Sequence, residues 1–179
     1  MKIKIAAAAN RLFSKHGFAE PGVEAIREAA DVSIRTLYKH YPSKDAMIVA
    51  ALAYRHEAYL VHLRRDAPSA PGLAAIEHLF QRLAAWMSGN GTRGCLFLQA
   101  FAAYPESAAI NNEVERNKEG VRAEIARRVP AHNQAIVPIL FLLHEGVTAA
   151  ASSVGAKAAA ESAISATKEL LAGNDRPRG

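Results

Sequence analysis

The chain has 179 residues, half of them hydrophobic, and a formal net charge of +5 at pH 7. A chain of this size and apolar content folds unaided, as one domain or as two small ones that share a core. The single cysteine excludes an intrachain disulfide framework, and the longest uninterrupted apolar run, 135–143, is far shorter than the ~20 residues of a membrane-spanning helix. We therefore expect a soluble, cytoplasmic protein with no membrane partner.

The positive charge lies mainly in the first third of the chain. Residues 1–66 carry 11 Lys and Arg against 7 Asp and Glu, whereas residues 67–179 carry 11 against 10. A modest surplus permits binding to a polyanion but does not by itself establish it. The surplus is therefore concentrated at the start of the chain.

Helix formers dominate the composition and apolar residues recur at helical spacing, so we predict an all-α fold of about nine helices. Gly17, Pro21 and the turn 31–33 separate three short helices. Ser33 is a good N-cap for the third helix and Ser43 for the fourth. The first four helices are predicted at 3–16, 23–30, 34–41 and from about 44 to about 65.

The stretch 67–72, rich in alanine and proline, is the clearest breaker and ends the fourth helix. Pro138 lies inside one of the later apolar segments, so that helix either begins near Val137 or bends there. The later helices are predicted near 73–87, 95–103, 107–129, 134–153 and 156–172.

Three short helices before a long one, with a tight turn between the second and third, form the layout of a helix-turn-helix. The segment 32–44 contains four basic residues and no acidic one, which predicts a positive surface. Leu37 and Tyr41 lie four residues apart on one face and are expected to point to the core. The residues expected to contact DNA lie elsewhere on this helix and at its ends: Ser33, Ile34, Arg35, Thr36, Tyr38, Lys39, His40 and Lys44.

The geometry of DNA gives several of these side chains a role. A major groove admits one helix, in which Arg35 can pair with a guanine edge and Ile34 can touch a thymine methyl group. Tyr38 can donate to a phosphate, and Lys44 combines an ammonium with the free backbone N–H groups of a helix start. The alternative is a solvated cationic face, with Tyr38 as a packing residue whose hydroxyl is hydrated.

The segment 29–46, AADVSIRTLYKHYPSKDA, and its spacing from 13–18, FSKHGF, closely resemble the DNA-binding domain of the TetR family of bacterial repressors. The resemblance covers residues 5–52. Beyond them, the chain resembles the family only in its number of helices and at 94–96 and 145–147.

Three positions depart from that pattern. Gly22 stands where the family usually has a small hydroxyl residue that caps the second helix, which puts a phosphate contact from this cap in doubt. Asp31 stands in place of a turn glycine, and Asp tolerates the left-handed conformation better than most residues. Arg27 replaces a common alanine and either contacts a phosphate or is solvated.

The resemblance implies a DNA-binding domain at 1–48 and a ligand-binding and dimerisation domain at 49–173. A disordered tail is expected at 174–179. The small molecule would bind among the middle helices, at Phe80, Leu83, Trp86, Met87, Phe97, Leu98, Phe101, Tyr104 and Asn111, with Asn112 as a further polar anchor. The homodimer would form through the last two helices, at Leu140, Leu143, His144, Val147, Ala151, Ala160, Ile164, Thr167 and Leu171. Ordinary core packing is the alternative for both sets.

Other chemistry has little support in the sequence. No two of the seven histidines have the three- or four-residue spacing of helical metal ligands. Cys95, close to Phe97 and Leu98, is interpreted as a small buried apolar residue, with a redox sensor as the alternative. No catalytic triad, carboxylate pair or phosphate-binding glycine loop can be assembled, so we expect no enzyme, no metal and no cofactor.

The function implied is that of a ligand-responsive transcriptional regulator. It would act as a repressor that binds a palindromic operator in double-stranded DNA as a homodimer and is released by a small, mainly apolar effector. The alternative is a helical small-molecule-binding protein or enzyme without DNA binding.

Overall fold

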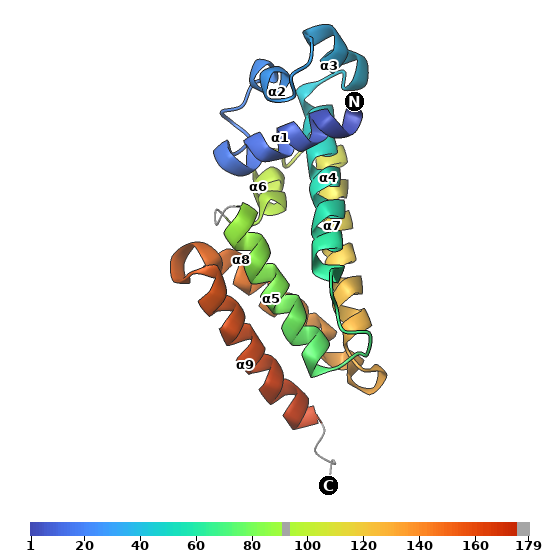
Figure 1. Ribbon diagram of the computed structural model, residues 1–179, viewed down its shortest axis with the longest axis vertical. Coiled ribbons are helices and arrows are strands. Elements are labelled where there is room, and N and C mark those ends of the chain that lie inside the picture. The colour runs from blue at the N-terminus through green and yellow to red at the C-terminus, as the bar shows by residue number, and fades with distance from the viewer. Residues whose placement is uncertain (91–93, 175–179) are drawn as a thin grey trace. The chain divides into compact units, whose positions relative to one another are not determined.

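The computed structural model describes residues 1–90 and 94–174, and these residues form α-helices and one 3-10 helix without a β-strand (Figure 1). This confirms the all-α prediction. Asn174 still belongs to the last helix, and the rest of the predicted tail lies outside the described residues. The elements are α1 Lys2–His16, α2 Val23–Ala29, α3 Ile34–His40, α4 Lys44–Arg64, α5 Leu73–Asn90, α6 Leu96–Ala103, α7 Ala108–Arg128, η1 Ala131–Ile136, α8 Val137–Val154 and α9 Ala156–Asn174.

Local signals in the sequence set most helix ends. Gly17 ends α1 with a positive φ of 75°, and its N–H donates to the carbonyl of Phe13. Ser33 caps α3, because its Oγ accepts a hydrogen bond from the Thr36 N–H at 3.1 Å. Pro138 lies in the first turn of α8, where a missing N–H costs nothing. The helix therefore begins at Val137, one of the two predicted alternatives.

The chain forms two compact units. The first consists of Met1–Tyr59 and Cys95–Lys118, and the second of Leu60–Gly94 and Glu119–Gly179. The first unit thus contains α6 and the first half of α7. The boundary predicted at residue 48 placed both of these in the second domain.

The core of the first unit joins the helix-turn-helix to α6 and α7. Phe13, Leu37 and Ile48 belong to the same buried cluster as Phe97 of α6 and Val114 of α7. Aromatic rings continue this contact, because Phe18 packs on Phe13 at 4.9 Å and meets the edge of Tyr104 at 6.0 Å between centroids. Residues 95–118 are therefore part of the packing that holds α1 to α4 together.

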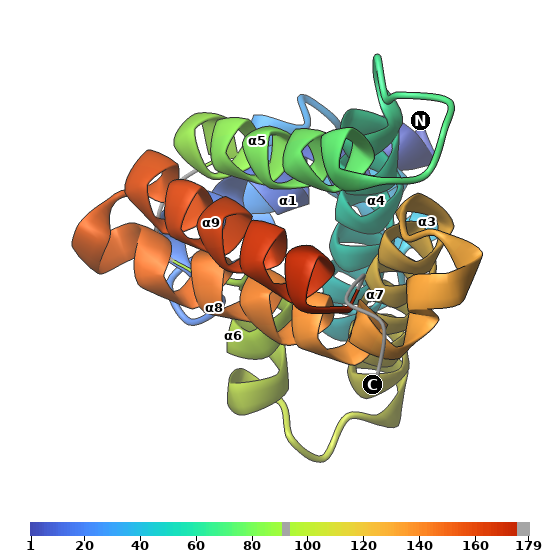
Figure 2. The same cartoon turned by 90° about the horizontal axis from the view of Figure 1, so that it is seen from below.

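In the second unit α9 packs along both α5 and α8 (Figure 2). Ile76, Leu79 and Phe80 of α5 and Leu140 of α8 are buried there. The segment 131–154, η1 followed by α8, is long and apolar enough to cross a membrane by length and composition, with a mean hydropathy of 1.6. A core helix of a soluble protein passes the same test, so this one segment is weak evidence for a membrane span.

A buried ionic network also lies in the second unit. The Glu124 side chain is fully buried and contacts three guanidinium groups, those of Arg64 at 2.9 Å, Arg127 at 2.9 Å and Arg128 at 3.0 Å. Arg128 is itself buried and also donates to the carbonyl of Leu63 at 2.6 Å. The network therefore ties the end of α7 to the end of α4.

Candidate nucleic-acid interface

The turn before α3 is held by contacts from α1 and α2. Asp31 adopts a positive φ of 48°, and the Lys4 ammonium lies 3.2 Å from both its carbonyl and its carboxylate oxygen. Arg27 donates from Nη1 to the carbonyl of Val32 at 3.4 Å. These contacts fix the direction in which α3 leaves the turn.

Arg27 has a different role from either of those considered from the sequence. Besides the bond to Val32, its guanidinium forms ion pairs with Glu24 and Glu28 on the same helix. Two carboxylates therefore compensate its charge, and the side chain braces α2 against the turn. Sequence reasoning missed this role, although Glu24, three residues before Arg27 and so at helical spacing, was an available signal.

One face of α3 packs against the rest of the first unit. Leu37 is fully buried, and the Tyr41 hydroxyl donates to the carbonyl of Lys2 at 3.3 Å. Burial raises the pKa of Tyr41, so this hydroxyl stays protonated and able to donate. The α3 helix is therefore anchored at its middle and at its end.

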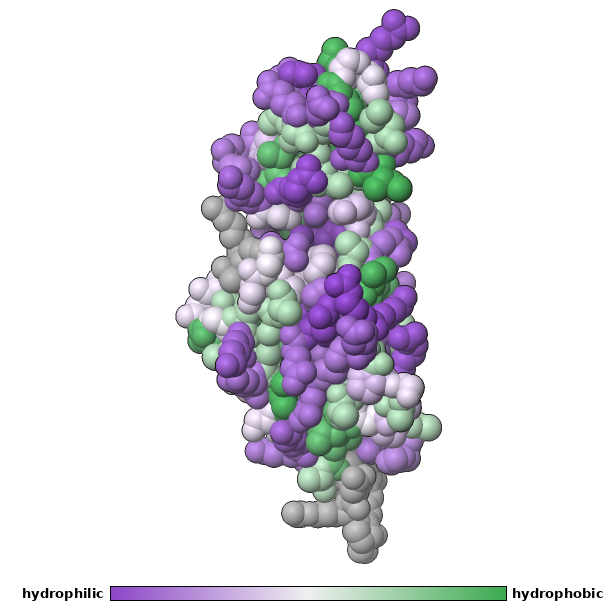
Figure 3. Space-filling view, in the orientation of Figure 1, coloured by the Kyte–Doolittle hydropathy of each residue, from purple (hydrophilic) through white to green (hydrophobic). Residues whose placement is uncertain are grey.

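The opposite face of α3 is exposed. Ile34 is 43% and Tyr38 46% exposed, and Arg35 and Lys39 lie beside them in solvent. Within the part of the chain that the structure describes, Arg35 and Lys39 form no ion pair or hydrogen bond. The surface over α2 and α3 in Figure 3 is mainly hydrophilic, with hydrophobic side chains between. We call Ile34, Arg35, Tyr38 and Lys39 the α3 face.

The other predicted DNA contacts lie at the two ends of this helix. Ser33 is exposed, while Thr36 and His40 are half-buried. Lys44 is also half-buried, and its Nζ donates to the carbonyl of Phe18 at 3.0 Å. An ammonium has three N–H donors, so this bond leaves Lys44 with donors for a phosphate.

The residues predicted to bind a ligand fall into both units. Phe80, Leu83, Trp86 and Met87 lie on α5 of the second unit, and Phe97, Leu98, Phe101, Tyr104 and Asn111 lie in the first. Phe80, Leu83, Met87 and Phe97 are buried, whereas Leu98 and Phe101 are about half exposed on α6. Asn111 donates to the carbonyl of Pro105 at 2.8 Å, and its buried Oδ1 accepts no hydrogen bond from the described residues. Asn112 is exposed.

The residues predicted to form the dimer interface lie largely inside the second unit. Leu140, His144, Val147, Ala151, Ala160 and Thr167 are buried within one chain, and Leu143, Ile164 and Leu171 are half-buried. Most of this stripe is therefore buried within one chain, and its part in a dimer stays a prediction. The exposed apolar side of α8 carries other residues: Ile139 and Val154, and Leu142, which is 68% exposed. Residues 139–143 are apolar without a break, so periodicity alone could not separate the two sides.

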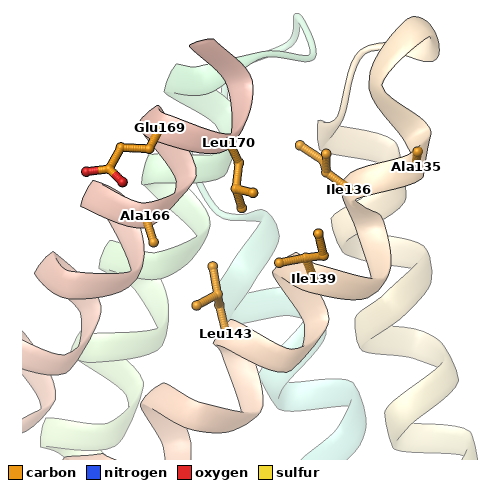
Figure 4. Close-up of a pocket in the computed structure, with 7 residues that line it drawn as sticks. All are labelled: Ala135, Ile136, Ile139, Leu143, Ala166, Glu169 and Leu170. Atoms are coloured by element: carbon orange, nitrogen blue, oxygen red, sulfur yellow. The ribbon is translucent and has the colours of Figure 1, made fainter. Parts of the chain in front are cut away.

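Two neighbouring apolar grooves run between α8 and α9 on this exposed side. The larger has a volume of about 670 Å³, and Figure 4 shows Ile139 and Leu143 of α8 facing Ala166 and Leu170 of α9 across it. The smaller, of about 290 Å³, begins at Leu143 and continues along the helices to Val154. We call Ile139, Leu142, Leu143 and Val154, with the grooves beside them, the α8 face.

Comparison with known proteins gives a family for the DNA-binding part. Residues 5–51 match the model of the bacterial regulatory proteins of the tetR family. No curated protein gave a significant match to the chain.

Solved structures share the fold over almost the whole chain. The TetR-family transcriptional regulator SCO4454 from Streptomyces coelicolor has a TM-score of 0.80 at 22% identity, covering 97% of this chain and 95% of its own. A putative tetR transcriptional regulator from Streptomyces avermitilis, sav143, has a TM-score of 0.77 at 25% identity, covering 97% of each chain. NemR from E. coli, in its reduced form, has a TM-score of 0.77 at 21% identity, covering 94% of this chain and 95% of its own.

The family match covers the helices that present the exposed cationic α3 face, and the fold extends over the rest of the chain. The helix-turn-helix of this protein, residues 5–51, belongs to the tetR family of bacterial regulatory proteins, and the whole chain has the fold of TetR-family transcriptional regulators.

Proposed function

We propose that this regulator is a cytoplasmic repressor, which binds a palindromic operator as a homodimer and is released by a small, mainly apolar effector. The observation that carries the proposal is the α3 face, where Arg35 and Lys39 are exposed and have no partner among the described residues. Elsewhere in the protein, arginines such as Arg128 are paired with carboxylates. Cations without intramolecular partners are available to the phosphates and base edges of DNA.

Each side chain of the interface has a proposed role in the major groove. Arg35, at the second position of α3, pairs with a guanine edge, and Ile34 contacts a thymine methyl group. Tyr38, Lys39 and His40 contact phosphates. Ser33, Thr36 and Lys44 set the register through hydroxyl and ammonium contacts to the backbone. Base preference therefore rests mainly on the first turn of α3.

A mobility-shift titration with the DNA upstream of the protein's own gene tests this function. We expect a complex with that DNA at lower protein concentration than with random DNA of equal length, and an affinity that falls steeply with salt. Equal, salt-independent binding to both DNAs, or no binding, would favour the alternative of a helical small-molecule-binding protein without DNA binding.

For the dimer, we propose that the α8 face of one protomer packs on the same face of its partner. A two-fold axis matches a surface to its own copy, and the grooves beside Leu142 offer room for the partner's ridge. Gly146 and Ala150 line the same side and allow a close approach of helices. Two recognition helices would then read half-sites about one helical turn, or a multiple of it, apart.

Leu142→Asp tests the interface, because it places a charge at the centre of an apolar contact. We expect the variant to sediment as a monomer and to bind operator at least about 100-fold more weakly, since one half-site remains. Val61→Asp on α4 alters an aliphatic residue of similar exposure and serves as the control. A Leu142→Asp protein that stays dimeric would contradict this use of the α8 face.

The effector is proposed from chemistry alone. Aromatic and aliphatic side chains dominate the residues predicted to bind it, so a mainly apolar molecule is expected. Such a molecule releases DNA only if it binds the DNA-free conformation more tightly than the DNA-bound one. A thermal-shift screen followed by a DNA-release assay identifies a molecule that meets both conditions.

A further inference from the structure

His62 near the end of α4 and Arg82 in the middle of α5 are joined by three reciprocal hydrogen bonds. His62 Nε2 lies 2.8 Å from the carbonyl of Arg82, and Arg82 donates from Nε to the carbonyl of His62 at 3.0 Å. The third contact joins Arg82 Nη2 to His62 Nδ1 at 3.0 Å. Both residues lie in the second unit, so the pair fastens α4 to α5 within it.

These partners determine the protonation state of the ring. A carbonyl only accepts hydrogen bonds, so Nε2 must carry a proton, and a guanidinium only donates, so Nδ1 must be bare. The observed contacts therefore require the neutral imidazole. A proton on Nδ1 would place two donors and two positive charges face to face at 3.0 Å.

His78 on α5 has the same arrangement with a different arginine. Its Nδ1 lies 3.0 Å from Nη1 of Arg128 on α7, and the ring also hydrogen-bonds the backbone of Arg65. Arg128 is held in place by Glu124 at 3.0 Å. The second ring thus links α5 to α7 and also requires a bare Nδ1.

The charges around the two rings are mainly positive. Arg82 and Arg65 face His62, and Arg128, Arg82, Arg65 and Asp66 face His78. Burial lowers the pKa of both histidines, and the neighbouring arginines lower it further, against the opposing hydrogen bonds to backbone carbonyls. Trp86 packs on His62 at 5.2 Å between centroids, and its ring would attract an imidazolium. This attraction is smaller than the free energy lost when the charge-assisted bond from Arg82 to Nδ1 breaks.

We propose that His62 and His78 form an acid-sensitive latch, which holds α5 to α4 and α7 only while both imidazoles are neutral. The lowered pKa values fix the sign of the pH dependence. In the unfolded chain each ring takes up a proton near its ordinary value of 6.5, whereas in the folded chain it resists protonation. The stabilisation is therefore complete above that value and is lost as the pH falls below it.

The fluorescence of Trp86 provides a direct test, because it is the only tryptophan of the chain and packs on His62. An imidazolium in contact with indole quenches its emission, so the full-length protein titrated from about pH 8 to about pH 5 should show a quenching step below about pH 6.5. The step should disappear in His62→Gln, whose amide can donate to one partner and accept from the other. His132→Gln alters an exposed histidine on η1 and should keep the step.

Thermal unfolding tests the latch as a whole. Between about pH 7.5 and about pH 5.5, where carboxylates barely titrate, the wild type should lose about 2–8 °C more in Tm than the double variant His62→Gln, His78→Gln. Parallel losses in the two proteins would overturn the proposal. Should the double variant fail to fold, the wild-type titration decides: a midpoint of the Trp86 step at or above about 6.5, or no step, overturns it equally.

Discussion

Two groups of cations in this protein have opposite surroundings. At the junction of α4 and α7, Arg64, Arg127 and Arg128 all contact the one buried carboxylate of Glu124. On the α3 face, Arg35 and Lys39 are exposed and have no intramolecular partner among the described residues. The difference shows which charges hold the fold and which are available for another molecule.

Removing the carboxylate should have the largest effect on stability. Glu124→Ala leaves Arg128, which is only 4% exposed, without a counter-charge, and we expect a loss of about 3–5 kcal/mol in the free energy of unfolding. Urea unfolding measures it, with Glu119→Ala on an exposed position of α7 as the control. A loss under about 1 kcal/mol would mean that Glu124 contributes no more to stability than an exposed ion pair does.

A substitution on the α3 face should have an intermediate effect, and it should change DNA binding and not stability. Arg35→Ala should weaken operator binding about ten- to a hundredfold while binding to random DNA changes little, because a guanine contact is lost. Its Tm should equal that of the wild type, since Arg35 has no partner to lose among the residues that the structure describes. Fluorescence anisotropy with both DNAs measures the ratio, and equal losses on the two DNAs would contradict a base contact.

Lys44→Ala should have the smallest effect. It sharpens the comparison, because this lysine is bonded within the protein and is also available to DNA. Its Nζ already donates to the carbonyl of Phe18, yet it has donors left for a phosphate. We expect a weakening of similar size on every DNA sequence and a salt slope lower by about one. Lys157→Ala on α9, an exposed lysine paired with Glu161, should leave the slope unchanged.

The sequence predicted features that depend on neighbouring residues. Ser33, Gly17 and Pro138 act within one turn of helix, so the corresponding helix ends could be placed to within a residue or two. Which residues of 34–41 face the core followed from the spacing of Leu37 and Tyr41. The roles of the exposed residues in DNA binding stay a prediction.

Features that depend on distant residues could not be read in the same way. Arg64 and Glu124 are sixty positions apart, and no periodicity records that they meet. The core side of α8 could not be told from its exposed side, because both sides are apolar and only the packing of α9 decides which of them is buried. Likewise, nothing local shows that Phe97 and Val114 pack with Phe13 and Leu37.

That shared packing has a consequence for protein engineering. A chimaera made by fusing residues 1–48 to another effector domain would leave out Phe97, Ile110 and Val114, which belong to the same buried cluster as Leu37 of α3. Such a graft would lack buried side chains that pack with the helix-turn-helix, and the cavity left behind would destabilise it. The compact unit that contains the helix-turn-helix is discontinuous in the sequence. Its two stretches, 1–59 and 95–118, have to be transplanted together.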